Sequence, residues 1–346
     1  MMGGLRTTAM GILPHRDAGR ALELSLSLDI PFLPQLPNAS FYEDMYVQTS
    51  GNFPGIVLDS EREKILFSLR KFREELERYF EMMEDEDLFK LRPPYSIIYP
   101  RFLELDLSGF YAVRGQVTGP VSFGFRVCDE EGKPIIYHDD VREILFDFIR
   151  RKVNVMLREL RERNERAFVW IDEPGLGWVF SAFSGYNDAQ AREDLREFFS
   201  GVEGLKGLHL CAEVNLPWLL DLGLDILSFD AYQLGEMPAE YARAAGEFLR
   251  RGGIIVWGIV PTEPALIERE DANSLALRLL GYWRRISEEA GLSLSEIAER
   301  SLLAPARCCV RAAEPSSSAL TPEEAVERAF SVLGELSSSL EAQLAE

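Results

Sequence analysis

The feature that most constrains the fold is the alternation of short apolar, β-rich runs with longer amphipathic segments along the 346-residue chain. This alternation is typical of a parallel sheet whose strands are joined by helices. Since no change of composition marks a linker, residues 1–346 are expected to form a single domain, an α/β (β/α)₈ TIM barrel. The eight expected strands are Thr7–Ile12, Ile30–Leu33, Tyr111–Val117, Ala167–Ile171, Gly207–Cys211, Ile226–Phe229, Ile254–Ile259 and Leu302–Ala304.

Helical spacing of apolar residues predicts the segments between the strands. The last helix begins with Thr321-Pro322-Glu323-Glu324, which supplies an N-cap, a proline at the first helical position and a capping-box glutamate. The first 110 residues are rich in proline and are expected to form long N-terminal loops over one face of the barrel. The expected helices are Glu61–Met83, Val141–Arg163, Ala239–Arg251, Asn273–Ala290 and Pro322–Leu344.

Charge and cysteine content narrow the class of protein. A net charge of −20 argues against binding to nucleic acid or to anionic membrane surfaces. No apolar run reaches the roughly 18 residues of a membrane helix, and the start of the chain lacks a signal-peptide pattern. Four cysteines in a chain of this length do not form a disulfide scaffold. We therefore expect a cytoplasmic protein with reduced thiols.

Imidazole, thiol and carboxylate groups follow several of the predicted strands. His209 and Cys211 lie two residues apart on one strand, so their side chains face the same way. With Asp230 and Cys308 they supply an imidazole, one or two thiolates and a carboxylate for zinc, and three protein ligands would leave a position open for a substrate. Asp230 could instead cap a turn or accept a hydrogen bond from the imidazole, and the cysteines could fill core space. Cys308 and Cys309 point opposite ways, and we favour Cys308 as the ligand.

Two carboxylates follow the apolar run Phe168–Ile171. Asp172 could bind an ammonium group, and Glu173 could act as a general acid or base. The pair could instead cap the next helix, because acidic residues are common in turns before proline.

Residues near the first and third predicted strands are further candidates for substrate binding. Gly11 would let the backbone approach a ligand closely, together with its neighbour Ile12. His15 follows in the same loop, although a lone loop histidine is more often structural. Gln116 could point into the mouth of the barrel.

Taken in order, these segments resemble the catalytic C-terminal barrel of cobalamin-independent methionine synthase. The resemblance is greatest to short, core-type members of the uroporphyrinogen decarboxylase and methionine synthase superfamily, and it covers nearly the whole chain. The segments that carry it are Thr8–His15, Gly115–Ser122, Ile171–Pro174, His209–Cys211, Asp225–Tyr232, Trp257–Pro261 and Ala304–Cys308.

The resemblance implies roles for individual residues. In that family a His-x-Cys pair, an acidic residue and a late cysteine bind zinc, and the matching positions are His209, Cys211, Asp230 and Cys308. It also implies that Asp172 holds the amino group of homocysteine, and that Gly11 with its neighbours lines the amino-acid pocket.

The chain also departs from the family pattern. The family's acidic ligand is usually glutamate, and its late motif usually reads Pro-x-Cys-Gly, whereas here Cys308 precedes a second cysteine. The pocket glutamate aligns near Ala39, and Phe125-Arg126 replaces the folate-stacking tryptophan. The N-terminal half of the long enzymes has no counterpart. These differences favour a corrinoid methyl donor, either methylcobalamin or a corrinoid protein, over a methylfolate.

The resemblance therefore implies a zinc-dependent S-methyltransferase that uses a small thiol, with homocysteine giving methionine. Asp172 and Glu173 are its candidate catalytic residues. One alternative is a metal-free enzyme similar to uroporphyrinogen decarboxylase, since Arg16-Asp17-Ala18-Gly19-Arg20 superficially resembles an arginine segment of that enzyme. We prefer to interpret that segment as a helix start capped by Asp17. The other alternative is a non-catalytic barrel that binds a corrinoid or a thiol.

Overall fold

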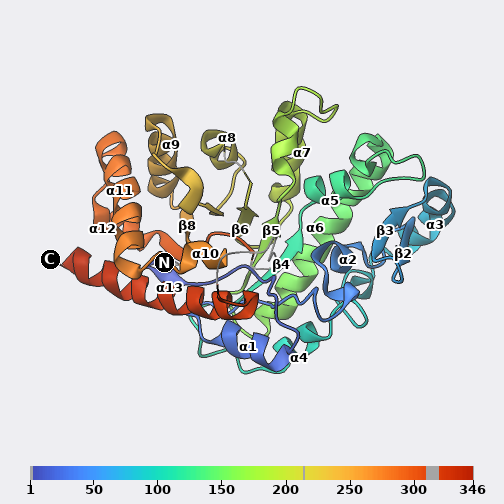
Figure 1. Ribbon diagram of the computed structural model, residues 1–346. Helices are drawn as coiled ribbons and strands as arrows, with labels where there is room; N and C mark the ends of the chain where they lie inside the picture. Colours follow the sequence, from blue (N-terminus) through green and yellow to red (C-terminus); the bar gives the residue numbers. More distant parts are fainter. Residues whose placement is uncertain (1–2, 213–214, 309–318, 346) are drawn as a thin grey trace.

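A computed structural model describes residues 3–212, 215–308 and 319–345. Its main sheet has seven strands in the order β1-β9-β8-β7-β6-β5-β4, and every neighbouring pair is parallel. The strands are β1 (Arg6–Thr7), β4 (Arg114–Thr118), β5 (Phe168–Asp172), β6 (Lys206–Leu210), β7 (Ile226–Asp230), β8 (Ile254–Val260) and β9 (Ser301–Pro305). The predicted parallel α/β arrangement is thus confirmed (Figure 1).

The expected strand Ile30–Leu33 is not a strand in the described chain, but it lies between the two edges of the sheet. The Ile30 amide donates to the Thr7 carbonyl, and the Leu33 amide donates to the Arg114 carbonyl, both at 3.0 Å. The proline at position 31 contributes no backbone N–H, which limits regular pairing. The prediction of eight strands is therefore wrong in number, and the fold is a TIM-barrel-like seven-stranded sheet with a bridging segment.

Helices follow most of the strands and cover the outside of the sheet (Figure 1). Four of the five predicted helices are confirmed with small changes at their ends. The helices are α1 (Ala18–Leu26), α2 (Met45–Ser50), α3 (Leu69–Met82), α4 (Ile98–Glu104), α5 (Pro120–Arg126), α6 (Asp139–Arg161), α7 (Asp188–Ser200), α8 (Leu216–Leu220), α9 (Ala239–Arg250), α10 (Pro264–Ile267), α11 (Ala272–Ala290), α12 (Leu294–Glu299) and α13 (Pro322–Ala345). The 3₁₀ turns are Phe41–Glu43, Glu86–Leu88, Ile135–Tyr137, Leu176–Phe180 and Tyr232–Leu234.

The predicted helix Glu61–Met83 is wrong in its first part. Residues 64–67 form β3 (Lys64–Phe67), which pairs antiparallel with β2 (Ile56–Asp59). Helix α3 starts only after Ser68, whose hydroxyl accepts a hydrogen bond from the Lys71 amide. Two apolar residues at 65 and 66 fit a helical stripe and a strand equally well, so spacing alone misassigned them.

The core has two layers separated by the sheet. Side chains that alternate along the strands fill the inside of the sheet, among them Trp170, Val256 and Leu302. The opposite side chains, such as Ile171 and Leu303, pack against the helices. This alternation is the period-two pattern of a strand that is buried on both faces.

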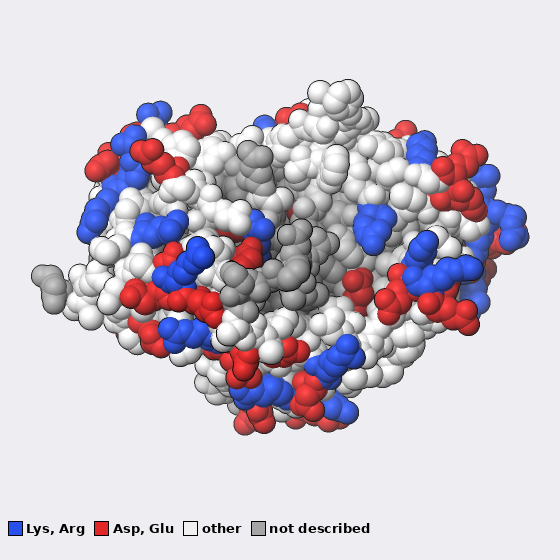
Figure 2. Space-filling view, in the orientation of Figure 1, with Lys and Arg blue, Asp and Glu red and all other residues white. Residues whose placement is uncertain are grey.

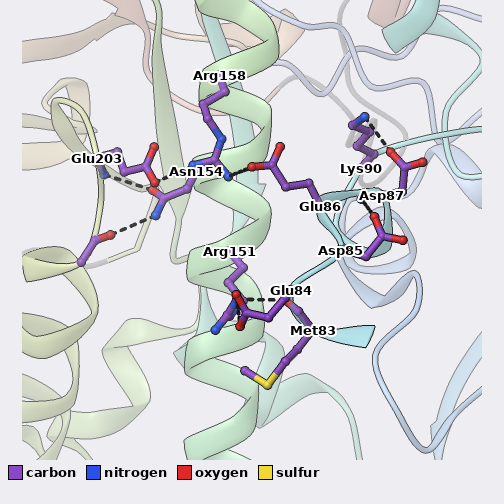
Figure 3. Close-up of polar contacts among 11 residues, drawn as sticks. Met83, Glu84, Asp85, Glu86, Asp87, Lys90, Arg151, Asn154, Arg158 and Glu203 are labelled. Atoms are coloured by element: carbon purple, nitrogen blue, oxygen red, sulfur yellow. Dashed lines mark hydrogen bonds and ion pairs between the residues drawn. The ribbon is translucent and has the colours of Figure 1, made fainter. Parts of the chain in front are cut away.

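Helix α6 connects the N-terminal part of the chain to the barrel (Figure 3). On one side, Arg151 donates to the Met83 carbonyl at 2.9 Å, and Arg158 pairs with Glu86 at 3.0 Å. On the other side, the Asn154 amide side chain exchanges two hydrogen bonds of 3.0 Å with the backbone at positions 201 and 203. The loop after α3 is therefore held against the same helix that packs on β4 and β5.

The start of the last helix is as predicted. The Glu324 amide donates to the Thr321 hydroxyl, and the Thr321 amide donates to the Glu324 carboxylate. Near the other end of α13, the Ser337 hydroxyl donates to the Leu5 carbonyl at 3.0 Å, which ties the last helix to the first strand. In the described part of the chain, no helix combines the length and the hydrophobicity needed to cross a membrane.

Candidate functional site

The candidate residues gather at the carboxyl ends of β5, β6, β7 and β9. Asp172 is the last residue of β5 and pairs in register with His209 of β6. Asp230 is the last residue of β7, while Cys211 and Cys308 follow β6 and β9. Active sites of barrels of this kind lie at these strand ends.

His209 is held rigidly by its surroundings. Its Nδ1 atom lies 2.9 Å from the Ser228 hydroxyl, and its ring stacks on Trp170 with 5.8 Å between ring centroids and an interplanar angle of 15°. The side chain is buried, and its Nε2 atom has no hydrogen-bond partner among the described residues. The contact with Ser228 leaves Nε2 available to a ligand, as in histidines that bind metals.

Cys211 lies beside both His209 and Cys308. The hydrogen bond to Cys308, together with burial, raises the pKa of the Cys211 thiol well above its usual value, although His209 opposes the shift. The same residue lines a pocket of about 420 Å³ whose wall also includes Asp230, Tyr241 and Arg307. The structure thus brings His209, Cys211 and Cys308 together, with Cys211 next to a pocket large enough for a small molecule.

Asp230 is engaged by a side chain that the sequence did not suggest. Its Oδ2 atom lies 2.5 Å from Nε of Arg307, and its Oδ1 atom accepts a hydrogen bond from the Gln233 amide at 3.1 Å. Burial raises the pKa of Asp230, and Arg307 opposes that rise. In this arrangement the cation beside Asp230 is a guanidinium, and the contact with the Gln233 amide is the turn-capping role that the sequence left open.

A zinc ion suits the chemistry of three of the four predicted ligands. The unpartnered imidazole nitrogen of His209 and two neighbouring thiols are donors that zinc prefers. However, within the described ranges no three or more His, Cys, Asp and Glu side chains are placed so as to hold a metal ion. Zinc binding by His209, Cys211, Asp230 and Cys308 stays a prediction, and it would require these side chains to move.

Asp172 is buried next to an arginine inside the sheet. Burial raises the pKa of Asp172 to about 7, although the nearby Arg114 lowers it. The guanidinium carbon of Arg114 lies 3.8 Å from the centroid of the Trp170 ring. Both Asp172 Oδ1 and Arg114 Nη2 are buried with no hydrogen-bond partner among the described residues. Such unpaired buried polar atoms are costly, and a polar ligand or water would satisfy them.

Glu173 makes the contacts of a helix cap. Its carboxylate accepts hydrogen bonds from the amides of Val121 and Ser122, at 3.0 and 2.7 Å, and from the Ser122 hydroxyl at 2.5 Å. These groups belong to the first turn of α5, so Glu173 caps a helix, but it is the preceding helix and not the next one that the sequence suggested. Burial raises the pKa of Glu173 to about 7 despite the three donors. A Cβ on Gly119 would stand only 2.1 Å from the Glu173 carboxylate, so the site requires glycine there.

Gly11 and Gln116 contact each other. A Cβ on Gly11 would lie 1.5 Å from the Gln116 amide nitrogen, so glycine provides space for that side chain. Gln116 is buried and donates to Gln35 at 2.7 Å, and Ile12 forms an isolated bridge with Gln35. The structure therefore uses the missing Cβ of Gly11 to accommodate the Gln116 side chain, and the close approach of a ligand at Gly11 stays a prediction.

His15 is buried near α13. Its Nε2 atom lies 3.9 Å from Glu327, and burial lowers its pKa. The neighbouring segment confirms the predicted cap, because Asp17 accepts a hydrogen bond from the Arg20 amide at the start of α1. Arg20 pairs with Glu23 and Glu327 at the surface.

The sequence analysis missed a buried polar chain that starts at Arg114. Arg114 donates to Gln116 at 2.8 Å, and the chain continues through Gln35 and Gln48 to Glu43. Its signal in the sequence was the charged Arg114, two residues from the polar Gln116, in a predicted strand, because an unpaired charge is not tolerated in a buried strand. The more distant partners Gln35 and Gln48 come from the proline-rich N-terminal segment, and no local pattern predicts them.

Charged side chains of both signs are interspersed on the face shown in Figure 2, mostly toward its edges. The acidic excess of the chain therefore does not form one continuous patch on that face.

Comparison with solved structures identifies the fold. The chain is similar to a B12-independent methionine synthase from Shewanella sp. W3-18-1, solved in complex with selenomethionine, with a TM-score of 0.54 and 13% sequence identity over 95% of this chain and 89% of that one. It is also similar to a methyltransferase from Methanosarcina mazei, with a TM-score of 0.52 and 16% identity over 96% of this chain and 94% of that one. At these identities the likeness establishes a shared fold. No protein-family model matches the chain, and neither does any curated protein sequence.

Proposed function

We propose that this protein is an S-methyltransferase that moves a methyl group to the sulfur of a small thiol, with homocysteine as the acceptor and methionine as the product. The observation that carries the proposal is the meeting of His209, Cys211 and Cys308 at the strand ends of a fold similar to two methyl-transfer proteins. Function is carried by the site, so the shared fold supports the proposal only together with these side chains.

In the proposed site, residues of this chain hold and orient the acceptor. The pocket of about 420 Å³ beside Cys211 admits the thiol. Asp172, whose Oδ1 atom lacks a partner among the described residues, would receive the amino group of the acceptor. Ser228 and Trp170 fix the orientation of His209, and Glu173 fixes the first turn of α5. Holding the reactants in one geometry supplies a large part of the rate enhancement.

We further propose that His209, Cys211 and Cys308 hold zinc, and that the methyl donor is methylcobalamin or a corrinoid protein. When bound, zinc would keep the acceptor thiol deprotonated at neutral pH. Asp230 would become a further zinc ligand only if its ion pair with Arg307 were broken.

Two measurements test the proposal with matched variants. Zinc-loaded protein should contain about one equivalent of zinc, and His209→Ala and Cys211→Ser should lose it, while Cys128→Ser should retain it. With methylcobalamin and homocysteine, the wild-type protein should form methionine, and the first two variants should be slowed about 100-fold or more. Methionine formation at an unchanged rate by His209→Ala would show that the chemistry lies elsewhere. Retention of zinc by both variants would remove the proposed ligand set.

A further inference from the structure

One buried amine takes no part in the proposed methyl transfer. Lys152 of α6 is only 5% exposed, and in the described part of the chain its amine makes no hydrogen bond or ion pair. Its Nζ atom lies 5.2 Å from the centroid of the Phe148 ring. Because an isolated charge is costly to bury, the pKa of the amine falls to about 7. Roughly half of the amines are then uncharged at neutral pH, and their nitrogen lone pair is nucleophilic.

The amine lines an enclosed cavity of about 20 Å³. Every described residue of its wall is buried, and the apolar part of the wall includes Phe89, Leu91 and Met156. A single water molecule needs roughly 10–15 Å³ of such space. The cavity therefore admits a molecule slightly larger than water, and it excludes metabolites of ordinary size.

The polar part of the wall has hydrogen-bond donors that are not used. Gln35 Nε2 donates to Gln48 at 2.7 Å, and Gln48 Nε2 donates to Glu43 at 2.9 Å. Each amide nitrogen carries two hydrogens, and the second has no acceptor among the described residues. The Thr49 hydroxyl accepts from the Thr118 amide at 3.2 Å and keeps its own hydrogen free to donate. The wall thus suits a group that is rich in hydrogen-bond acceptors, which an amine is not.

The charges nearest to this wall along the hydrogen-bonded chain favour an anion in the cavity. Gln116, which lines the cavity, accepts a hydrogen bond from the buried Arg114 at 2.8 Å. At the other end, Gln48 donates to Glu43, and burial raises the pKa of Glu43 toward its neutral form. A guanidinium behind Gln116 compensates negative charge on the group that replaces the amine.

We propose that Lys152 is a modification site that takes up carbon dioxide as a carbamate. Carbon dioxide is small and uncharged, so it can reach an enclosed cavity that ions and larger electrophiles cannot enter. The Lys152 nitrogen attacks its carbon and a C–N bond forms. The electron pair of one C–O π bond moves to oxygen, and one proton leaves the nitrogen for water. The two carbamate oxygens then accept the free hydrogens of Gln35, Gln48 and Thr49. The inference does not depend on the proposed methyl transfer.

NMR spectroscopy of the full-length protein tests the modification directly. The protein is labelled with ¹⁵N at the lysine side-chain nitrogens and equilibrated with ¹³C-labelled carbon dioxide and bicarbonate at neutral pH. The folded wild type should show a carbonyl resonance that is split by ¹⁵N, which requires a C–N bond to lysine and excludes a carbamate on the chain terminus. Lys152→Met should lose this resonance, whereas Lys64→Met, on the exposed β3, should keep it. Unfolding in guanidinium chloride should abolish it, because an exposed lysine with a pKa of 10.5 is protonated.

A second variant tests whether the carbamate lies in this cavity. Thr49→Val keeps the shape of the side chain and removes one donor to a charged group, so carbon dioxide should bind about tenfold more weakly. Wild-type affinity in Thr49→Val would overturn the placement in this cavity. The absence of a split resonance in the folded wild type would refute the modification, and so would a split resonance of full intensity in Lys152→Met.

Discussion

The buried amine of Lys152 allows a quantitative test of how burial of a charged group affects the stability of this fold. It lies in the middle of α6, its side chain is buried, and burial lowers its pKa to about 7 without opposition from any carboxylate of the described residues. A cavity of about 20 Å³ beside it, lined by Gln35, Gln48 and Gln116, is large enough for one water molecule. The amine is therefore accommodated largely by losing its proton rather than by an ion pair.

Replacing Lys152 with methionine should stabilise the protein by an amount that depends on pH. The amine has a pKa of 10.5 when exposed and about 7 when folded, so the unfolded chain binds more protons between these values. Stability due to this group therefore rises with pH across that window. At pH 7 the cost of the buried amine is about 4 kcal/mol, and at pH 10 it is about 1 kcal/mol. Lys152→Met should recover these amounts, since methionine has a similar length and needs no solvation.

Thermal and urea unfolding of the variant at the two pH values measure this effect. For a chain of this size, about 4 kcal/mol corresponds to a rise of about 6 °C in Tm at pH 7. Lys64→Met on the exposed β3 is the matched control and should change stability by less than about 0.5 kcal/mol. An equal gain at pH 7 and pH 10 would refute the titration argument, and a loss at both would show that the amine makes favourable contacts.

Three further predictions concern the strand-end site. Gly119→Ala should destabilise the protein by about 2 kcal/mol, because the new Cβ displaces the Glu173 carboxylate from its three hydrogen-bond donors. Urea unfolding measures this loss, and a midpoint equal to that of the wild type would contradict the prediction. The pKa of Glu173 is raised from 4.5 to about 7, so between these pH values the folded state keeps a proton that the unfolded chain releases. The contribution of Glu173 to the free energy of unfolding therefore falls by about 3 kcal/mol from pH 4.5 to pH 7. Glu173→Gln should flatten that pH dependence, and an unchanged slope would assign it to another group. Arg307→Ala should cost about 1 kcal/mol by removing the cation beside Asp230, which keeps its hydrogen bond from the Gln233 amide, and adding Asp230→Asn should recover part of it in a double-mutant cycle.

The sequence predicted the fold best where a segment is long and its pattern is unambiguous. The interior strands and the helices α6, α9, α11 and α13 were predicted to within a few residues, because each buries a continuous apolar face. The wrong assignments fall in the first 70 residues, and beyond them the longest helix that was not predicted is α7 (Asp188–Ser200). In the first 70 residues the strand Ile30–Leu33 contains a proline, and the β2–β3 hairpin is short. Local pattern could not separate a hairpin from the start of α3, since the difference depends on what packs beneath it.

The candidate site was only partly accessible from the sequence. Strand-end position placed His209, Cys211 and Cys308 at one edge of the sheet, because parallel strands end there, and their role as zinc ligands stays a prediction. The partner of Asp230 was missed, since Arg307 lies 77 residues away in the chain and no spacing rule connects them. The network around Arg114 was missed for the same reason.

The pairing of the first strand with the last has a consequence for synthesis of the chain. β1 (Arg6–Thr7) hydrogen-bonds to β9 at Leu302 and Leu303, so its neighbour in the sheet emerges from the ribosome about 300 residues after it does. At ordinary elongation rates of 5–20 residues per second, the first strand waits for at least about 15 seconds with its edge unpaired. α13, which holds Leu5 through Ser337, emerges later still. Completion of the sheet thus waits for residues 301–305, and a nascent chain stalled before residue 300 is left with an exposed strand edge available to chaperones.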